Sequence, residues 1–252
     1  MLKPEKQIRD KLNLYNNIIE RKLGKIEGNK IPIENVPKVQ RKIGRNYQNT
    51  GMFELVLGDC GNSMSEFEES VEWYSRALEE FRNRRDSPWE SEANNVLDLL
   101  HSALLSGHTE HREMAAEMAL EVPEEFVDRF PTTYRYFYMK ALAASILETN
   151  EACQYLNSLE KELANLEGTK HTFFEALWLA LSGIEQRDDK QFSEGIHQFL
   201  NWHDQQVDFE NKTSAKDLVC RQAASLLVLA RQKGLEVRID SEYIPECVYE
   251  LA

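Results

Sequence analysis

The chain has 252 residues, of which 42% are hydrophobic, and its formal net charge is −13. This hydrophobic content is enough for a buried core and excludes an intrinsically disordered chain. Helix-forming residues dominate, whereas only 11 Gly and 7 Pro punctuate the chain, which favours helices over many short strands. No stretch approaches the ~20 apolar residues of a membrane span, and the N-terminus lacks the apolar run of a secretory signal, so we expect a cytoplasmic protein without membrane contact.

Charge is unevenly distributed along the chain. Residues 1–50 carry 12 Lys and Arg against 5 Asp and Glu, whereas the remainder carries 18 against 38. We expect the basic N-terminal segment to be solvated or to pack against the rest of the chain. The acidic remainder would repel phosphate groups, which argues against nucleic acid as a partner and suits a basic protein.

The four cysteines are Cys60, Cys153, Cys220 and Cys247, and no two of them form a CxxC pair. This spacing excludes a zinc knuckle and a thioredoxin-like redox motif. We therefore expect four reduced thiols, most of them buried.

Apolar residues recur at spacings of three and four along most of the chain, which predicts about ten helices joined by short loops. The first helix is expected from Pro4 to about Leu23, followed by a loop over 24–37 and further helix over 39–47 and 52–57. Capping boxes, in which Ser or Thr precedes Glu by three residues, predict three helix starts: Ser63 with Glu66, Ser87 with Glu90, and Thr172 with Glu175.

The last part of the chain predicts a helix over 218–231 that is apolar around most of its circumference and lies deep in the core. Gly234 ends it, residues 237–240 form an extended link, and residues 241–251 close the chain with a short helix. No alternation of strands and helices is present. We expect one all-α domain over 1–252, with antiparallel hairpins stacked in a right-handed superhelical, tetratricopeptide-like array.

Sequence motifs for common enzyme chemistry are absent. There is no GxGxxG, GxxxxGK[ST], GxSxG or HExxH. His101, His108 and His111 come nearest to a metal cluster, but no Cys or firm carboxylate partner accompanies them, so surface or capping roles are favoured. We expect no metal, no cofactor and no catalysis. An active site built from these histidines and Glu110 is the catalytic alternative.

Two groups of residues are candidate partner contacts. Tyr134, Tyr136 and Tyr138 belong to an aromatic cluster too wide for one helical face to bury, and exposed tyrosines are typical of binding surfaces. Burial against a neighbouring helix is the alternative, and it is favoured. Asp188 and Asp189 lie between two expected helices, where an N-cap is the favoured interpretation and a divalent-ion site the other.

The C-terminal half carries a resemblance to a known family. Its residues are Tyr136-x-Tyr138-x-Lys140-Ala141-Leu142-Ala143-Ala144, then Ala176-Leu177-Trp178-x-Ala180-Leu181-x-x-Ile184, and finally Ala230-Arg231 through Gly234-Leu235-Glu236-Val237 to Tyr243-Ile244-Pro245. Over residues 134–247 the chain resembles the forty-ninth family of immunity proteins from bacterial and archaeal polymorphic toxin systems. Members of that family are all-helical and are encoded beside a toxin that they neutralise.

The resemblance implies that the chain binds and neutralises a cognate toxin by protein–protein contact. It brings no catalytic residues with it. The acidic body would attract a basic toxin. A helical scaffold or regulator that holds a peptide in a concave groove is the alternative function, and self-association is left open.

Overall fold

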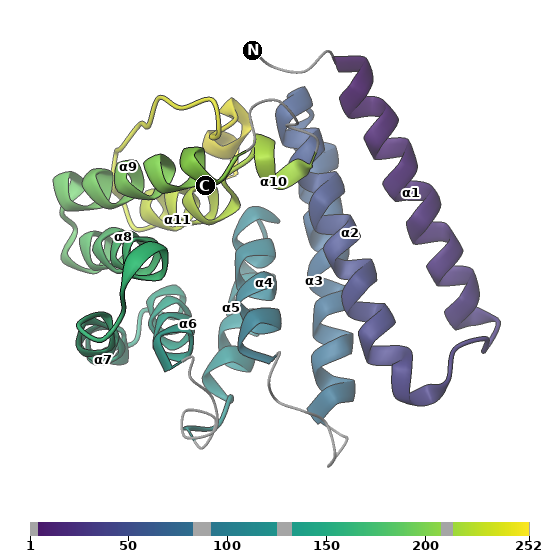
Figure 1. Cartoon of the computed structure of the whole chain (residues 1–252), viewed down its shortest axis with the longest axis horizontal. Helices are drawn as coiled ribbons and strands as arrows, with labels where there is room; N and C mark the ends of the chain where they lie inside the picture. Colours follow the sequence, from purple (N-terminus) through teal and green to yellow (C-terminus); the bar gives the residue numbers. More distant parts are fainter. Residues whose placement is uncertain (1–4, 83–91, 125–132, 208–213, 252) are drawn as a thin grey trace.

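The computed structural model describes residues 5–82, 92–124, 133–207 and 214–251, and these contain helices and no strand (Figure 1). The all-α prediction is therefore confirmed. None of the described helices combines the length and apolar character that a bilayer-spanning segment needs. The helices are α1 (Glu5–Glu27), η1 (Ile33–Asn35), α2 (Val36–Leu57), α3 (Cys60–Arg82), α4 (Glu92–Leu105), α5 (Thr109–Leu120), α6 (Thr133–Ile146), α7 (Glu151–Leu163), α8 (Gly168–Gln186), α9 (Asp189–Gln206), α10 (Ala215–Leu218), α11 (Arg221–Gln232) and η4 (Glu246–Glu250).

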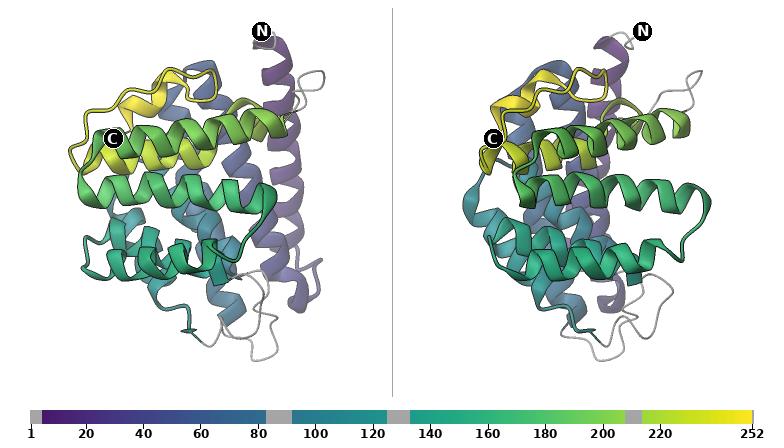
Figure 2. Two further views of the ribbon diagram at one scale, coloured as in Figure 1. Left: turned by 60° about the vertical axis from the view of Figure 1, so that its left-hand side comes forward. Right: turned by 90° about the vertical axis from the view of Figure 1, so that its left-hand side faces the viewer.

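Helices that follow one another in the sequence pack side by side. The pairs α2 with α3, α6 with α7 and α8 with α9 make extensive contacts, as the short connecting loops predict. Figure 2 shows α8, α9 and α11 stacked one above another and lying across the long axis of α1. The right-handed superhelical twist stays a prediction.

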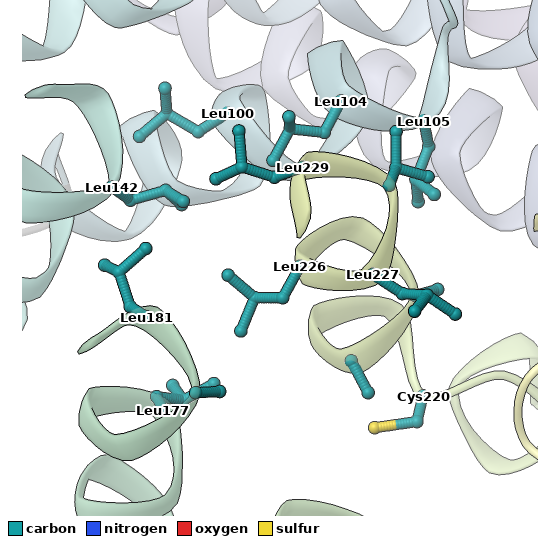
Figure 3. Packing of buried hydrophobic residues seen from close by; sticks show 14 of the residues in the cluster. Leu100, Leu104, Leu105, Leu142, Leu177, Leu181, Cys220, Leu226, Leu227 and Leu229 are labelled. Carbon is teal, nitrogen blue, oxygen red and sulfur yellow. The ribbon is translucent and has the colours of Figure 1, made fainter. Parts of the chain in front are cut away.

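Helix α11 occupies the centre of the core, as its apolar sequence predicts. All eight residues from Ala223 to Ala230 are buried. Leucines of three other helices surround α11: Leu100, Leu104 and Leu105 of α4, Leu142 of α6, and Leu177 and Leu181 of α8 (Figure 3). One cluster of buried residues extends from Ile8 in α1 to Leu251, so the N-terminal helices share this core.

Gly234 ends α11 in a Schellman motif, which confirms the predicted helix end. Its φ is +85°, in the left-handed region. The Gly234 N–H donates to the Arg231 carbonyl at 2.9 Å, and the Leu235 N–H donates to the Ala230 carbonyl at 3.0 Å.

Replacing Gly234 with Val is expected to lower the free energy of unfolding by about 1–2 kcal/mol. No atom lies within 4 Å of a Cβ placed there, so the cost comes from the backbone conformation and not from a clash. Urea denaturation followed by circular dichroism measures this difference. An unchanged urea midpoint would contradict the assignment of Gly234 as the left-handed residue that ends α11.

The capping box predicted at Ser63 and Glu66 is wrong. Both residues lie inside α3, where Ser63 Oγ donates to the Gly51 carbonyl at 3.0 Å and the Glu66 carboxylate accepts a hydrogen bond from Thr50. Asp59 caps this helix instead, because its Oδ1 accepts from the backbone N–H three residues later at 3.1 Å. Hydrogen bonds to α2 thus outweigh the local capping preference.

The capping box predicted at Thr172 is also wrong. Helix α8 begins at Gly168, and Thr172 lies in its first turns with its Oγ1 donating back to the Gly168 carbonyl at 3.4 Å. This is the i to i−4 bond that Ser and Thr form within helices. The box predicted at Ser87 and Glu90 falls outside the described residues.

The prediction of four reduced thiols needs correction. Cys60 at the start of α3 and Cys247 in η4 form a disulfide across 187 residues of sequence. Cys153 is exposed and Cys220 is buried, and both are free thiols. The disulfide fastens the C-terminal segment to the α2–α3 hairpin.

Lys140 of α6 is buried, with 3% of its surface exposed, and its Nζ donates to the carbonyl of Leu120 at the end of α5 at 2.6 Å. Burial, followed by the charge of Arg82, lowers the pKa of Lys140 from 10.5 to about 8. The folded chain therefore releases this proton at a lower pH than the unfolded chain. Lys140 makes the free energy of unfolding rise with pH between about 8 and 10.

A Lys140→Met variant is expected to lose this rise. Methionine keeps an unbranched apolar stem without a titrating group. Urea denaturation of both proteins at pH 7.5 and pH 9.5 should show a larger rise in the free energy of unfolding for the wild type than for the variant. An equal rise in the free energy of unfolding in both proteins would contradict the lowered pKa of Lys140.

Candidate functional site

The three candidate tyrosines lie on α6 and are buried. Tyr134, Tyr136 and Tyr138 expose 4%, 4% and 1% of their surface, which confirms the favoured interpretation that they pack against neighbouring helices and contradicts the exposed surface that was the other interpretation. The reason is that α6 packs against α4, α5, α7 and α8 and has almost no free face. Tyr134 meets the ring of Phe174 in α8 edge-on, with the ring centroids 4.6 Å apart.

Asp188 is the N-cap of α9, which confirms the favoured interpretation. Its carboxylate accepts from the backbone N–H groups of Lys190 and Gln191, both at 3.0 Å. Asp188 and Asp189 are exposed at the junction of α8 and α9. Their use as partner contacts stays a prediction.

The three histidines fall into two separate environments. His101 is buried in α4, its Nδ1 lies 2.7 Å from Ser225 Oγ in α11, and burial holds its pKa well below the usual value. His108 and His111 lie at the start of α5 with ring centroids 5.3 Å apart, and His108 Nε2 is 3.8 Å from Glu68. Within the described part of the chain, no three His, Cys, Asp or Glu residues form a metal-binding group.

Side chains from six helices line a hollow of about 450 Å³ that sequence reasoning missed. A second hollow of about 520 Å³ adjoins it. Both hollows are lined by Arg45 of α2, Asp98 of α4, Phe173 of α8, Trp202 of α9, and Arg221 and Gln222 of α11. We call the two hollows together the central groove.

A hydrogen-bonded network fixes one wall of the central groove. Arg221 Nη2 donates to Asp98 Oδ1 at 2.7 Å, and both side chains are about 15% exposed. Arg221 also donates to Gln48, whose Nε2 donates to the Asp98 carbonyl at 3.1 Å and to Ser102 Oγ at 2.7 Å. Arg45 lies 3.8 Å from Asp98 Oδ2. This wall therefore joins α2, α4 and α11 and holds Arg221 in one position.

The central groove is basic, in contrast to the net charge of −13 of the chain. Its described lining includes two carboxylates, Asp98 and Asp217, and five cationic side chains. The five cations are Arg45, Arg135, Lys170, Lys216 and Arg221. A local excess of positive charge thus lies within an acidic molecule.

Aromatic rings and two buried polar atoms complete the groove. The rings of Phe173 and Trp202 meet edge-on with centroids 4.6 Å apart. The Tyr138 hydroxyl and Trp202 Nε1 are buried, and neither has a hydrogen-bond partner among the described residues. Burial raises the pKa of Tyr138, so its hydroxyl keeps its proton.

Comparison with models of known protein families shows to which family this chain belongs. The family model described as immunity protein 49 matches residues 48–247. The chain belongs to the immunity protein 49 family. The match extends well beyond the resemblance over 134–247, since it begins in α2 and ends in η4. No curated protein and no solved structure matches the chain.

The immunity protein 49 match contains most of the central groove. Of the residues that line the two hollows, only Tyr15 and Arg45 precede residue 48. Both cysteines of the disulfide also lie within it. Most of the groove and both cysteines of the disulfide thus lie in the region that the family model matches.

Proposed function

We propose that this immunity protein binds a cognate toxin and neutralises it by protein–protein contact, without catalysing a reaction. Membership of the immunity protein 49 family over residues 48–247 carries this proposal. The buried His101 has a structural partner in Ser225, which gives it a role that needs no substrate.

The charge of the chain indicates the kind of toxin. With a net charge of −13, the chain attracts a basic protein over long range and accelerates its association. Such attraction weakens as salt rises, because the Debye length falls from about 10 Å at 0.1 M to about 3 Å at 1 M. We propose a basic toxin met in the cytoplasm.

Growth rescue tests the proposed function. The toxin domain encoded beside this chain is expressed from an inducible promoter, alone or together with the chain. We expect growth arrest by the toxin alone, and restored colony numbers together with a co-purifying complex when both are present. A version of the gene with an early stop codon is the control. Arrest that the intact chain fails to relieve would contradict the proposal.

The scaffold alternative makes a different prediction for the same experiment. A scaffold or regulator that holds a peptide would have a neighbour that is harmless when expressed alone. Growth of the strain that carries only the neighbouring gene therefore distinguishes the two functions.

A further inference from the structure

Two residues that line the central groove carry polar groups that the described chain leaves unsatisfied. Tyr138 is 1% exposed, and its hydroxyl has no hydrogen-bond partner among the described residues. The same holds for Trp202 Nε1. Both residues line the same hollow of about 450 Å³. Buried polar groups without partners are costly and rare in folded proteins, so these two groups suit a ligand that accepts hydrogen bonds.

Exposed cationic side chains, which we call the rim of the groove, line the same hollow. Lys170 and Arg45 are exposed. The one carboxylate among the described residues that line this hollow, Asp98, already pairs with Arg221 at 2.7 Å. A net positive charge therefore remains for an incoming anion, and charge-assisted hydrogen bonds to a carboxylate are among the strongest that proteins form.

Apolar surface lies next to these polar groups. Phe173 and Phe174 contribute rings to the same hollow, and Phe173 packs edge-on against Trp202. A volume of about 450 Å³ falls within the range of about 300–1,000 Å³ that is usual for ligand pockets. The hollow can hold an anionic side chain together with an apolar neighbour.

We propose that the central groove receives a carboxylate-bearing segment of the toxin. An Asp or Glu side chain of that segment would pair with Lys170 and accept hydrogen bonds from the Tyr138 hydroxyl and Trp202 Nε1. An adjacent apolar side chain would pack against Phe173. This inference rests on the proposed function, because side-chain carboxylates are the anionic groups that an unmodified protein partner offers.

Electrostatic attraction then acts at both long and short range. The acidic body draws in a basic toxin from a distance, and the basic groove selects one carboxylate at short range. A basic protein without a carboxylate in the matching place would be attracted but held weakly. The groove therefore accounts for specificity where net charge alone cannot.

Three variants of the chain test the groove against the toxin domain encoded beside it. Tyr138→Phe removes only the buried hydroxyl, and Lys170→Glu reverses one charge at the rim. Lys38→Glu is the matched control, because it makes the same charge change at an exposed position of α2 outside both hollows. Dissociation constants come from biolayer interferometry and melting temperatures from circular dichroism.

We expect Tyr138→Phe to weaken binding about tenfold and Lys170→Glu about a hundredfold, the scale of one and two lost charge-assisted contacts. Lys38→Glu should stay within about threefold of the wild type. The melting temperature of Tyr138→Phe should be unchanged or higher, because its hydroxyl makes no bond within the described chain. A purely structural hydroxyl would give the opposite result, with a lower melting temperature.

The outcomes separate this inference from the proposed function. Wild-type affinity in both groove variants, with growth still rescued, overturns the groove assignment and leaves the immunity function intact. A lower melting temperature of Tyr138→Phe with unchanged affinity overturns it as well. Absence of any complex with the wild-type chain overturns the proposed function. The groove assignment is then overturned as well, because it depends on a toxin that binds the chain.

Discussion

Removal of the Cys60–Cys247 disulfide is expected to lower the free energy of unfolding by about 5 kcal/mol. The bond closes a loop across 187 residues, and the chain-entropy model assigns about 5 kcal/mol to a loop of this length. Urea denaturation of a Cys60→Ser, Cys247→Ser variant measures the loss. Reduction of the wild type should give the same midpoint as the variant.

Cys153→Ser is the matched control, because Cys153 is an exposed free thiol on α7. Its free energy of unfolding should stay within about 0.5 kcal/mol of that of the wild type. Alkylation in denaturant without reductant should label two cysteines per chain, Cys153 and Cys220. Equal urea midpoints of the wild type with and without reductant would contradict the disulfide. Alkylation of all four cysteines without reductant would contradict it as well.

The disulfide also bears on the proposed cytoplasmic location. Cytosolic thiols are usually kept reduced, and disulfides persist in oxidising compartments. A chain that works in the cytoplasm would carry Cys60 and Cys247 as thiols and would have the lower stability of the reduced form. Alkylation in intact cells before lysis therefore tests the location together with the redox state.

Replacing Gly195 with Ala is expected to lower the free energy of unfolding by about 3 kcal/mol or more. Helices α8 and α9 cross with their backbones in contact, and a Cβ on Gly195 would lie 2.4 Å from the Ala180 backbone nitrogen and 2.9 Å from the Ala176 carbonyl oxygen. A side chain can relieve such a clash by a change of rotamer, but a backbone atom cannot, so the two helices must separate. Gly183 is the matching position on α8, where a Cβ would lie 2.4 Å from the backbone nitrogen of Phe192.

Gly24→Ala provides the control for Gly195→Ala. Gly24 lies in α1, and a Cβ added there would meet no atom within 4 Å. Alanine should stabilise this helix by up to about 1 kcal/mol. Because α8 and α9 also carry Phe173 and Trp202, Gly195→Ala should weaken partner binding as well. Equal effects of the two substitutions would contradict a close α8–α9 crossing.

Much of the fold follows from short-range patterns in the sequence. The apolar circumference of residues 218–231 predicted the buried α11, and Gly234 predicted its end. Asp188 predicted the start of α9. These features depend on neighbours within one or two helical turns, so the sequence alone contains them.

Predictions that depend on tertiary neighbours were less successful. Ser63 has the spacing of a cap, yet its hydroxyl bonds to Gly51 of α2, and no local pattern reveals that α2 lies there. The pairing of Cys60 with Cys247 spans 187 residues and leaves no trace in their spacing.

The central groove could not be found from the sequence for the same reason. The described residues that line it come from α1, α2, α4, α6, α8, α9, α10 and α11, which no local sequence pattern brings together. The sequence pattern favours burial of Tyr138, but it does not show that the buried hydroxyl has no partner among the described residues. The excess of Lys and Arg in the groove is hidden in the sequence by the acidic composition of the whole chain.

Titration of the purified toxin domain into the purified chain tests the central claim most directly. The product of the neighbouring gene, which we propose to be the toxin, is purified separately from the chain for this purpose. We predict a one-to-one complex with a dissociation constant below about 10 nM, whose association rate falls as salt is raised. Absence of binding at micromolar concentrations of both proteins would contradict the account.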